Sequence, residues 1–415
     1  MPRFLSITKS FLFVAASCAL FAAPTNAADP YARVTENRSG QVTLEMCERT
    51  FKPIEADGPR IHLISVIHIA DKSFYDAMQT LLESYDSVLF EGVKPAGLDP
   101  IDPQLEDQDK ANATADRLDL LTQIAAQYTN HTGSLPESFD DLLASDDPRI
   151  VAIISSIQTD GWGQPIAMSH TRSMDNPSSS NQITFTSNGA DFLPAGEGVN
   201  ADITKSWTHE PNRSKKAAPE GVQTQLADAL HVEFQLDAMD MTGKGWINAD
   251  IDINELQAQL AEMGEDNAMI LQLIEGNSFQ AKLIGFVLKF VKRSPTMSSM
   301  MKLAMMDMLA LVETTNMLSQ FEAIEKVILL GRNDIVIEYL KAELANNPEA
   351  NDIAIFYGAG HMPGIEHTIL TEMGYKFESN TWAQAMTVNT KDTGLSQAQV
   401  KMMRNMIKNS LENQF

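Results

Sequence analysis

The sequence predicts an α/β protein built on a mainly parallel sheet with flanking helices, together with a helical subdomain and a small inserted α+β domain. Two observations predict the sheet. Residues 60–70 form a near-continuous apolar, β-branched run, which is typical of a strand buried on both faces, and residues 352–358 form another. A third observation predicts the insert, because the composition changes abruptly to Gly, Ser and Asn within residues 111–212.

The first half of the sheet follows from residues 60–92. After the first strand, Asp71 can cap a helix whose apolar positions, among them Phe74 and Met78, recur at helical spacing. The segment "SVLFEG" then provides a second strand at residues 87–92. A strand, a helix and a strand in this order predict a βαβ unit with parallel pairing.

The second half follows from residues 326–374. We expect a strand at residues 326–330, then a helix that Asn333 can cap and that ends before Pro348. The strand "DIAIFYGAG" follows, and then a helix over residues 363–373 that Gly374 closes. The two halves are expected to share one sheet.

The expected domain organisation begins with a secretory signal peptide. Residues 1–27 contain Arg3 and Lys9, an apolar core and then small residues, with cleavage expected near Ala27 or Ala28. A lipid anchor at Cys18 is the alternative, but the apolar run continues past it. Residues 28–110 and 213–415 form the two halves of the α/β domain and residues 111–212 the insert, while a Met-rich region at 260–325 is helical.

Composition restricts the function and the location. The formal charge of -24 argues against nucleic-acid binding, since no basic excess exists to meet phosphates. No apolar run after the signal peptide is long enough to span a bilayer. We therefore expect an exported protein, periplasmic or secreted in a Gram-negative bacterium, without a stable membrane span.

Three ionisable side chains are predicted at one edge of the sheet. His68 ends the first strand, Glu91 ends the second, and His361 follows the last strand after a glycine turn. Ligands of parallel sheets bind at the carboxyl ends of the strands. Two imidazoles and a carboxylate can hold a divalent transition metal, or can act without metal as general acid and base.

Three further residues are relevant to the predicted site at this edge. Arg332 is expected at a fourth strand end, where it could hold a carboxylate or an oxyanion. His367, one turn into the helix at residues 363–373, could form a hydrogen bond to a metal ligand without itself binding the metal. His62 lies six residues before His68 and is interpreted as a satisfied core histidine.

Several of these segments resemble one protein family. "SVIHIADKSFYDAM", "SVLFEG", "GRND" and "YGAGHMPGIEHTILTEMGYKF" are similar to the TraB/PrgY/GumN family, which includes the Tiki metalloproteases. The resemblance implies a Tiki/EreA/ChaN-like fold and a divalent-metal hydrolase, with peptide-bond cleavage shown for some members. It places His68, Glu91 and His361 at the metal and Arg332 at a conserved arginine. The first GxxH motif has Ser65 in place of glycine, and the second, residues 358–361, is intact.

The insert resembles a different family. "LLTQIAAQYTNHTGSLPESFDDLL", "DGWGQPI" and "FTSNGADFLPAGEGVNADITKSW" are similar to the globular part of the major pseudopilin of type II secretion. That resemblance implies a calcium site with Asp191 and Asp202 as ligands and carbonyls around Ser187; a solvated acidic turn is the alternative.

Two functions remain open from the sequence. One is an exported metal-dependent hydrolase acting on a peptide or protein, with Mn, Co or Zn as the metal and Glu91 as either ligand or base. The other is a binding or secretion-accessory protein that acts through the insert on a secretion-system or envelope partner.

Overall fold

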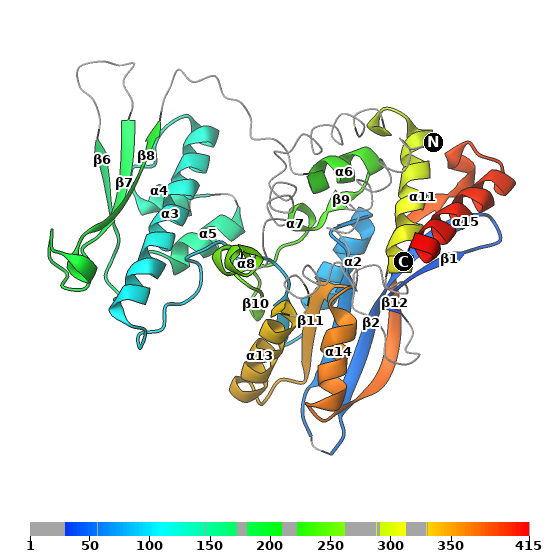
Figure 1. Cartoon of the computed structure of the whole chain (residues 1–415), viewed down its shortest axis with the longest axis horizontal. Coiled ribbons are helices and arrows are strands. Elements are labelled where there is room, and N and C mark those ends of the chain that lie inside the picture. Colours follow the sequence, from blue (N-terminus) through cyan, green and yellow to red (C-terminus); the bar gives the residue numbers. More distant parts are fainter. Residues whose placement is uncertain are drawn as a thin grey trace.

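The computed structural model describes residues 30–55, 57–145, 147–171, 181–209, 222–261, 288, 291–312, 329 and 331–414 (Figure 1). The expected signal peptide, most of the Met-rich region 260–325 and nearly all of the expected strand at 326–330 lie outside these residues.

A seven-stranded sheet organises the larger part of the described chain. Six strands follow one another in the order β1-β2-β3-β11-β5-β10, and β12 pairs with β2. Their bounds are β1 Ala32–Glu36, β2 Gln41–Pro53, β3 Arg60–Val66, β5 Ser87–Phe90, β10 Trp246–Asn248, β11 Asp352–Gly358 and β12 Tyr375–Asn389.

The strands β3, β11, β5 and β10 are parallel, which confirms the expected class of a mainly parallel central sheet with flanking helices. The apolar side chains of β3 and β11 are buried on both faces, because helices cover both sides of the sheet. The antiparallel strands β1, β2 and β12 extend one end of the sheet and were not predicted.

The expected fourth parallel strand was assigned to the wrong segment. Leu329, the one described residue of 326–330, is helical, and α13 (Gly331–Asn346) begins two residues later. The fourth strand is β10, which pairs in parallel with β5. Asn333 therefore lies within the first turn of α13 and not before it.

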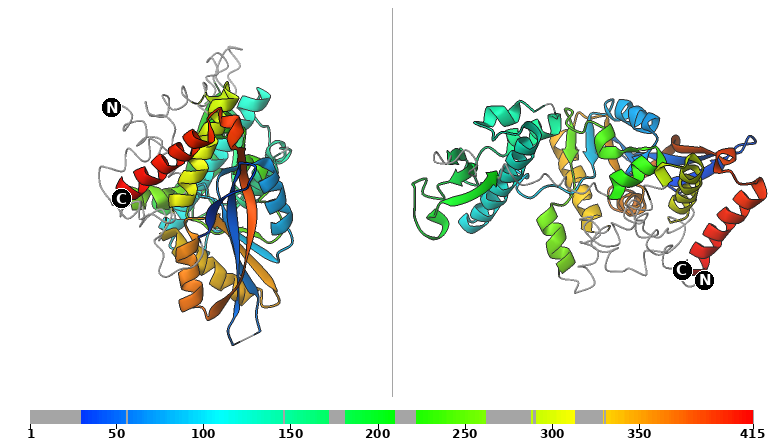
Figure 2. Two further views of the ribbon diagram at one scale, coloured as in Figure 1. Left: turned by 90° about the vertical axis from the view of Figure 1, so that its right-hand side faces the viewer. Right: turned by 90° about the horizontal axis from the view of Figure 1, so that it is seen from above.

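Helices cover the two faces of the sheet. In the left panel of Figure 2, α2 (Lys72–Leu82) lies on one face, and α13 and α14 (Met362–Thr371) lie on the opposite face. Both helices predicted beside the strands β3 and β11 are thus present. The helix α14 ends at Thr371, and Gly374 follows with a φ of 74°, in the left-handed region where glycine is favoured.

Further elements surround this core. The short strands β4 (Ile69–Ala70) and β9 (Glu233–Phe234) pair with each other. In the sequence, β9 is preceded by α6 (Val222–Leu230) and followed by α7 (Gln235–Ala238) and α8 (Ile253–Ala261). The helix α11 (Pro295–Val312) carries the methionine run, and Met305, Met306 and Met308 are buried in the main hydrophobic core, as expected for packing. The chain continues after β12 through η4 (Thr390–Thr393) to the helix α15 (Gln397–Gln414), which contacts α11.

Residues between β5 and α6 form a second unit with its own hydrophobic core (Figure 1, left). The helix α3 packs on a three-stranded antiparallel sheet, and the core includes Leu118, Leu121, Ile154, Ile183 and Phe185. The bounds of its elements are α3 Asp107–Thr132, α4 Phe139–Leu143, α5 Pro148–Ser156, β6 Ala167–Thr171, β7 Asn181–Ser187, η1 Gly198–Asn200 and β8 Ile203–His209. We call residues 107–209 the small module.

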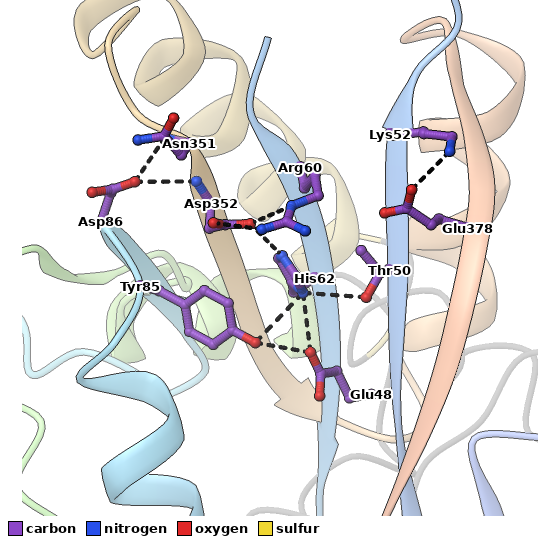
Figure 3. Close-up of polar contacts among 10 residues, drawn as sticks. All are labelled: Glu48, Thr50, Lys52, Arg60, His62, Tyr85, Asp86, Asn351, Asp352 and Glu378. Carbon is purple, nitrogen blue, oxygen red and sulfur yellow. Dashed lines mark hydrogen bonds and ion pairs between the residues drawn. The ribbon is translucent and has the colours of Figure 1, made fainter.

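At the amino ends of the parallel strands, His62 is held on both ring nitrogens (Figure 3). Its Nδ1 lies 3.0 Å from Glu48 Oε1 and its Nε2 lies 2.8 Å from Asp352 Oδ1. Tyr85 donates to the same Glu48 oxygen at 2.8 Å, and Arg60 donates to Asp352. His62 is 6% exposed, so its interpretation as a satisfied core histidine is confirmed.

Within the described residues, no helix is both long enough and apolar enough to cross a membrane.

Candidate functional site

The carboxyl ends of the parallel strands bring Glu91 and His361 together. Glu91 directly follows β5, and its backbone N–H continues the ladder by donating to Phe356 O at 3.0 Å. His361 follows β11 after a turn that its own N–H closes on Gly358 O at 2.9 Å. The Nε2 atom of His361 then lies 3.5 Å from Glu91 Oε1.

The glycine turn is needed for this approach. The backbone N–H of Gly358 donates to Glu91 Oε2 at 2.6 Å, and a Cβ atom at residue 358 would lie 3.0 Å from that same oxygen. A larger residue would therefore push the carboxylate away from its donor. This explains why glycines stand between the strand and the histidine.

Glu91 is a buried carboxylate that is held in its ionised form. Burial alone would raise the pKa of Glu91, but the charge of Arg332, with further contributions from His361 and His68, holds that pKa well below its usual range. A carboxylate with a low pKa is a weak base near neutral pH. The geometry therefore favours Glu91 as a ligand or a fixed negative charge over Glu91 as the base that takes a proton from water.

Arg332 does not stand at a strand end. It lies in the first turn of α13, 7% exposed, and its guanidinium donates to Glu91 Oε1 at 2.7 Å and to both oxygens of Asp250 at 2.8 and 2.5 Å. These two carboxylates occupy the guanidinium, so Arg332 positions Glu91. The expectation that it would hold a substrate carboxylate or oxyanion is not supported by this geometry.

Asp250 is a site residue that sequence reasoning missed. It follows the short fourth strand β10, and its side chain is fully buried. Its carboxylate also accepts the N–H of Gly92 at 2.9 Å. A recognised strand at residues 246–248 would have placed Asp250 at the same edge as Glu91, but three residues are too few for a reliable strand pattern.

His68 is positioned by a second chain segment. It lies just after β3, and the pairing of β4 with β9 brings Gln235 beside it. The backbone N–H of Gln235 donates to His68 O at 2.8 Å, and the Gln235 side-chain oxygen lies 3.1 Å from His68 Nδ1. Two contacts with one residue thus fix both the backbone and the ring.

His361 is held in the same manner by Asn333. The Asn333 Oδ1 atom lies 2.8 Å from His361 Nδ1, and Gly364 allows α13 and α14 to approach closely at this point. In both histidines a carboxamide oxygen accepts from Nδ1–H, so that in the neutral ring Nε2 carries the lone pair that a metal requires. Neither Gln235 nor Asn333 was assigned this role from the sequence.

The serine in the first GxxH motif points away from this edge. Ser65 is 1% exposed, and its hydroxyl lies 2.9 Å from Cys47 O and 3.0 Å from Tyr31 O, while it accepts the N–H of Cys47 at 2.9 Å. These contacts tie β3 to β2. The replacement of glycine by serine is therefore accommodated inside the sheet.

His367 is exposed on α14. A residue that supports a buried metal ligand must contact it, so this exposure gives no support to the role expected for His367.

The residues at the edge suit a cation in type and in charge. Two carboxylates and one guanidinium leave one negative charge, and the Nε2 atoms of His68 and His361 add two further donors when the rings are neutral. Asn248, at the end of β10, donates its side-chain N–H to Gly92 O. Among the buried side-chain nitrogen and oxygen atoms of the described residues, its Oδ1 alone has no hydrogen-bond partner. An orphaned oxygen of this kind is a place for water or a cation.

Their spacing in this conformation is wider than a metal requires. Across the described ranges, no three His, Cys, Asp or Glu side chains lie close enough together to hold a metal ion. Of the three predicted residues, Glu91 and His361 approach each other, and His68 lies near enough for its charge to lower the pKa of Glu91. A metal held by all three residues therefore requires them to lie closer together than they do here.

The three residues expected to bind calcium lie around one loop of the small module. Asp191 Oδ1 accepts the N–H of Leu193 at 3.0 Å, and Asp202 Oδ1 accepts the N–H of Ala195 at 2.9 Å. Ser187 is buried, and its hydroxyl donates to Asp160 Oδ2 at 2.6 Å. Its hydroxyl is therefore engaged within the module.

In comparisons with protein-family models, with curated proteins and with solved structures, nothing matches this chain. The two family resemblances therefore rest on the motifs quoted above.

Proposed function

We propose that this protein is an exported hydrolase that depends on a divalent transition metal and acts on peptide bonds. The observation that carries the proposal is the meeting of Glu91 and His361 at the carboxyl edge of the sheet, with the Nδ1 atoms of His361 and His68 both held by carboxamides. His68, Glu91 and His361 would hold the metal. Mn, Co and Zn are all compatible with this donor set.

When bound, such a metal lowers the pKa of a coordinated water and so supplies a nucleophile for hydrolysis. The chain's own residues orient the donors. Arg332 and the N–H of Gly358 fix the two oxygens of Glu91, and Asp250 balances the charge of Arg332. Gln235 and Asn333 fix the rings of the two histidines.

The first test is metal content. The protein is purified from the periplasm and analysed by mass spectrometry beside a His68→Ala/His361→Ala double variant and a His367→Ala control, in which an exposed histidine of α14 is removed. We expect near-stoichiometric transition metal in the wild type and the control and its loss in the double variant. Equal transition-metal content in all three proteins would refute the site.

The same measurement tests the calcium proposal. Asp191 and Asp202, each with one oxygen bound to a backbone N–H, would hold calcium together with carbonyls near Ser187. An Asp191→Asn/Asp202→Asn variant should lose calcium and keep the transition metal. Retained calcium in this variant would leave the loop as a solvated acidic turn.

A second candidate is a non-catalytic binding or secretion-accessory role that acts through the small module on a secretion-system or envelope partner. The observation in its favour is that the module has its own core and exposes Phe192 and Leu193, which are 48% and 62% accessible, on one loop. Because α3 begins at Asp107, deletion of residues 107–209 separates the candidates more cleanly than a cut at residue 111. A hydrolase should keep some activity on a small substrate after this deletion, whereas a binding protein should lose its partner.

A further inference from the structure

A pocket of about 470 Å³ lies where the small module meets the segment that leads into it. Its volume falls in the range of pockets that bind small organic ligands, about 300–1,000 Å³. One wall is the incoming segment at residues 98–103, and the other is the loop at residues 159–163. The residues that matter for the argument are Leu98, Ile101, Lys110, Arg117, Trp162 and Phe192.

The pocket contains a buried arginine without a carboxylate among its hydrogen-bond partners. Arg117 is 4% exposed, and its guanidinium donates to three backbone carbonyls, those of Gly97 at 3.2 Å, Asp99 at 2.9 Å and Thr159 at 2.7 Å. These carbonyls come from both walls, so the guanidinium lies between them. Carbonyls have no net charge. Burial lowers the pKa of Arg117, and the negative charge of Asp160 opposes this only in part.

A second cation, on the same helix, lines the same pocket. The Lys110 side chain is only 14% exposed, and the nearest carboxylate to its ammonium is that of Asp107, at 3.9 Å and itself 54% exposed. Asp107 also accepts the indole N–H of Trp162 at 2.9 Å. The lysine is therefore only loosely paired.

The one buried acid of the pocket wall is already satisfied. Asp160 is 3% exposed, and its Oδ1 accepts the N–H groups of Trp162 and Gln164 while its Oδ2 accepts the hydroxyl of Ser187. Among the residues that line the pocket, the two cations Lys110 and Arg117 thus outnumber the one carboxylate, that of Asp160; Asp107 is not part of the lining. In a chain with a formal charge of -24, a lining with one excess cation suits an anion.

The remaining lining is apolar and includes a strained aromatic residue. Phe192 is 48% exposed, yet its φ is 63°, in the left-handed region that bulky residues avoid. Hydrogen bonds from the backbone of Leu193 and Ala195 to Asp191 and Asp202 hold the loop that carries it. Phe192 thus adds a half-exposed phenyl group to the lining of the pocket.

We propose that this pocket binds a small apolar carboxylate, of the kind found at the C-terminus of a peptide with an apolar last side chain. The carboxylate would pair with Lys110 and Arg117, and the apolar group would lie against Trp162 and Phe192. The site is separate from the metal edge and stands whether or not the hydrolase proposal holds.

The test is isothermal titration of the full mature chain with matched probes. N-acetyl-phenylalanine is compared with N-acetyl-phenylalanine amide, which has the same side chain and no charge, and decanoate is compared with decanol. We expect each carboxylate to bind at least about tenfold more tightly than its neutral partner. Tighter binding of N-acetyl-phenylalanine than of decanoate identifies a peptide C-terminus as the source, and the reverse order overturns that part of the proposal.

Two variants and a matched control localise the binding. Lys110→Met should weaken carboxylate binding about tenfold, and Phe192→Ser should weaken it severalfold. Lys205→Met removes a cation of the same module that pairs with Asp119 and does not line the pocket, so it should change nothing. Arg117 is left intact because its three carbonyl contacts hold the module together.

Three results would overturn the proposal. Equal binding of the charged and neutral probes would leave only an apolar groove. Binding that survives both Lys110→Met and Phe192→Ser would place the ligand elsewhere. No binding of either carboxylate up to about 10 mM would show that the charge excess recruits no ligand of this class.

Discussion

Replacement of Arg332 by methionine tests whether the buried ion pairs govern both the stability and the electrostatics of the candidate site. Arg332 lies between Glu91 and Asp250, and the side chains of all three residues are at most 8% exposed. Methionine keeps much of the volume and removes the charge. Two buried carboxylates then face each other's charge without a cation between them.

The expected cost is large because the carboxylates remain buried. Breaking a buried ion pair by removing one partner typically costs about 3–5 kcal/mol, since the remaining charge loses its compensation and cannot reach water. Glu91 keeps the N–H of Gly358 and Asp250 keeps the N–H of Gly92, so neither loses all of its donors. We therefore expect a loss of about 3 kcal/mol in the free energy of unfolding at pH 7.5, near the lower end of that range.

The loss should depend on pH in a defined direction. In the wild type the pKa of Glu91 is held below its unfolded value, so its contribution to stability is present above about pH 4.5 and is lost only as the pH falls through the lower, folded pKa. Without Arg332, burial dominates and the folded pKa of Glu91 rises above the unfolded one. The ionised form then destabilises the variant at high pH, and protonation relieves that penalty as the pH falls, so the difference between the proteins should shrink by about 1–2 kcal/mol between pH 7.5 and 5.

Urea unfolding followed by tryptophan fluorescence measures this difference, because Trp246 on β10 lies beside Phe90, one residue before Glu91. A loss of about 3 kcal/mol corresponds to a shift of about 1–2 M urea in the midpoint. Leu340→Ala is the control, since Leu340 is fully buried on the same helix and its cavity cost has no reason to change with pH. A loss below about 1 kcal/mol for Arg332→Met, or an equal loss at both pH values, would refute the reasoning.

Three other predictions address single contacts. Asn333→Leu should weaken transition-metal affinity about 10–100-fold because the ring of His361 loses its acceptor, and a metal titration with unchanged affinity would contradict this. Tyr85→Phe removes a 2.8 Å hydrogen bond to the Glu48 carboxylate and should cost about 1–2 kcal/mol at pH 7 by urea unfolding. Burial opposes the ionised form of Glu48, but the hydrogen bonds from His62 and Tyr85 lower its pKa, so this cost should fade below about pH 4; a cost that persists there would argue against the assignment. Gly97→Ala and Gly133→Ala change two glycines with φ near 80°, but only at Gly97 would the new Cβ meet backbone, 2.5 Å from Arg117 N. The first should therefore lower the thermal stability of the small module by about 1–3 kcal/mol more than the second, and equal effects would show that strain alone matters.

The parts of the fold that the sequence predicts are those with an uninterrupted local pattern. The strands β3, β5 and β11 are continuous apolar runs, and α2 and α14 begin with ordinary helix-start signals, so each could be placed within a few residues. The strands β2 and β12 were missed because polar residues interrupt them. Arg49 on β2 is 2% exposed only because Glu366 and Asn380, more than 300 residues away, accept its hydrogen bonds. A local pattern cannot show such a partner.

The candidate site was predictable to the same extent. Glu91 and His361 follow recognisable strands, and parallel strands bring their carboxyl ends to one edge. Arg332 was placed correctly near Glu91 but for the wrong reason, since it reaches the site from a helix and not from a strand. Asp250, Gln235 and Asn333 act on residues that lie 28 to 167 positions away, and only the folded chain brings them together.

Histidines at the two edges of this sheet show how the same kind of side chain can serve two purposes. At the amino edge both ring nitrogens of His62 have carboxylate partners, and the ring is part of a closed network with Tyr85 and Arg60 (Figure 3). At the carboxyl edge His361 and His68 are each tied through Nδ1 to a neutral carboxamide, and His361 turns its Nε2 toward Glu91. Two carboxylates occupy both ring nitrogens and tie strands together, whereas one carboxamide occupies Nδ1 and leaves the other nitrogen available. The partners of the ring nitrogens, more than burial, thus distinguish a histidine that serves the fold from one that can serve a metal.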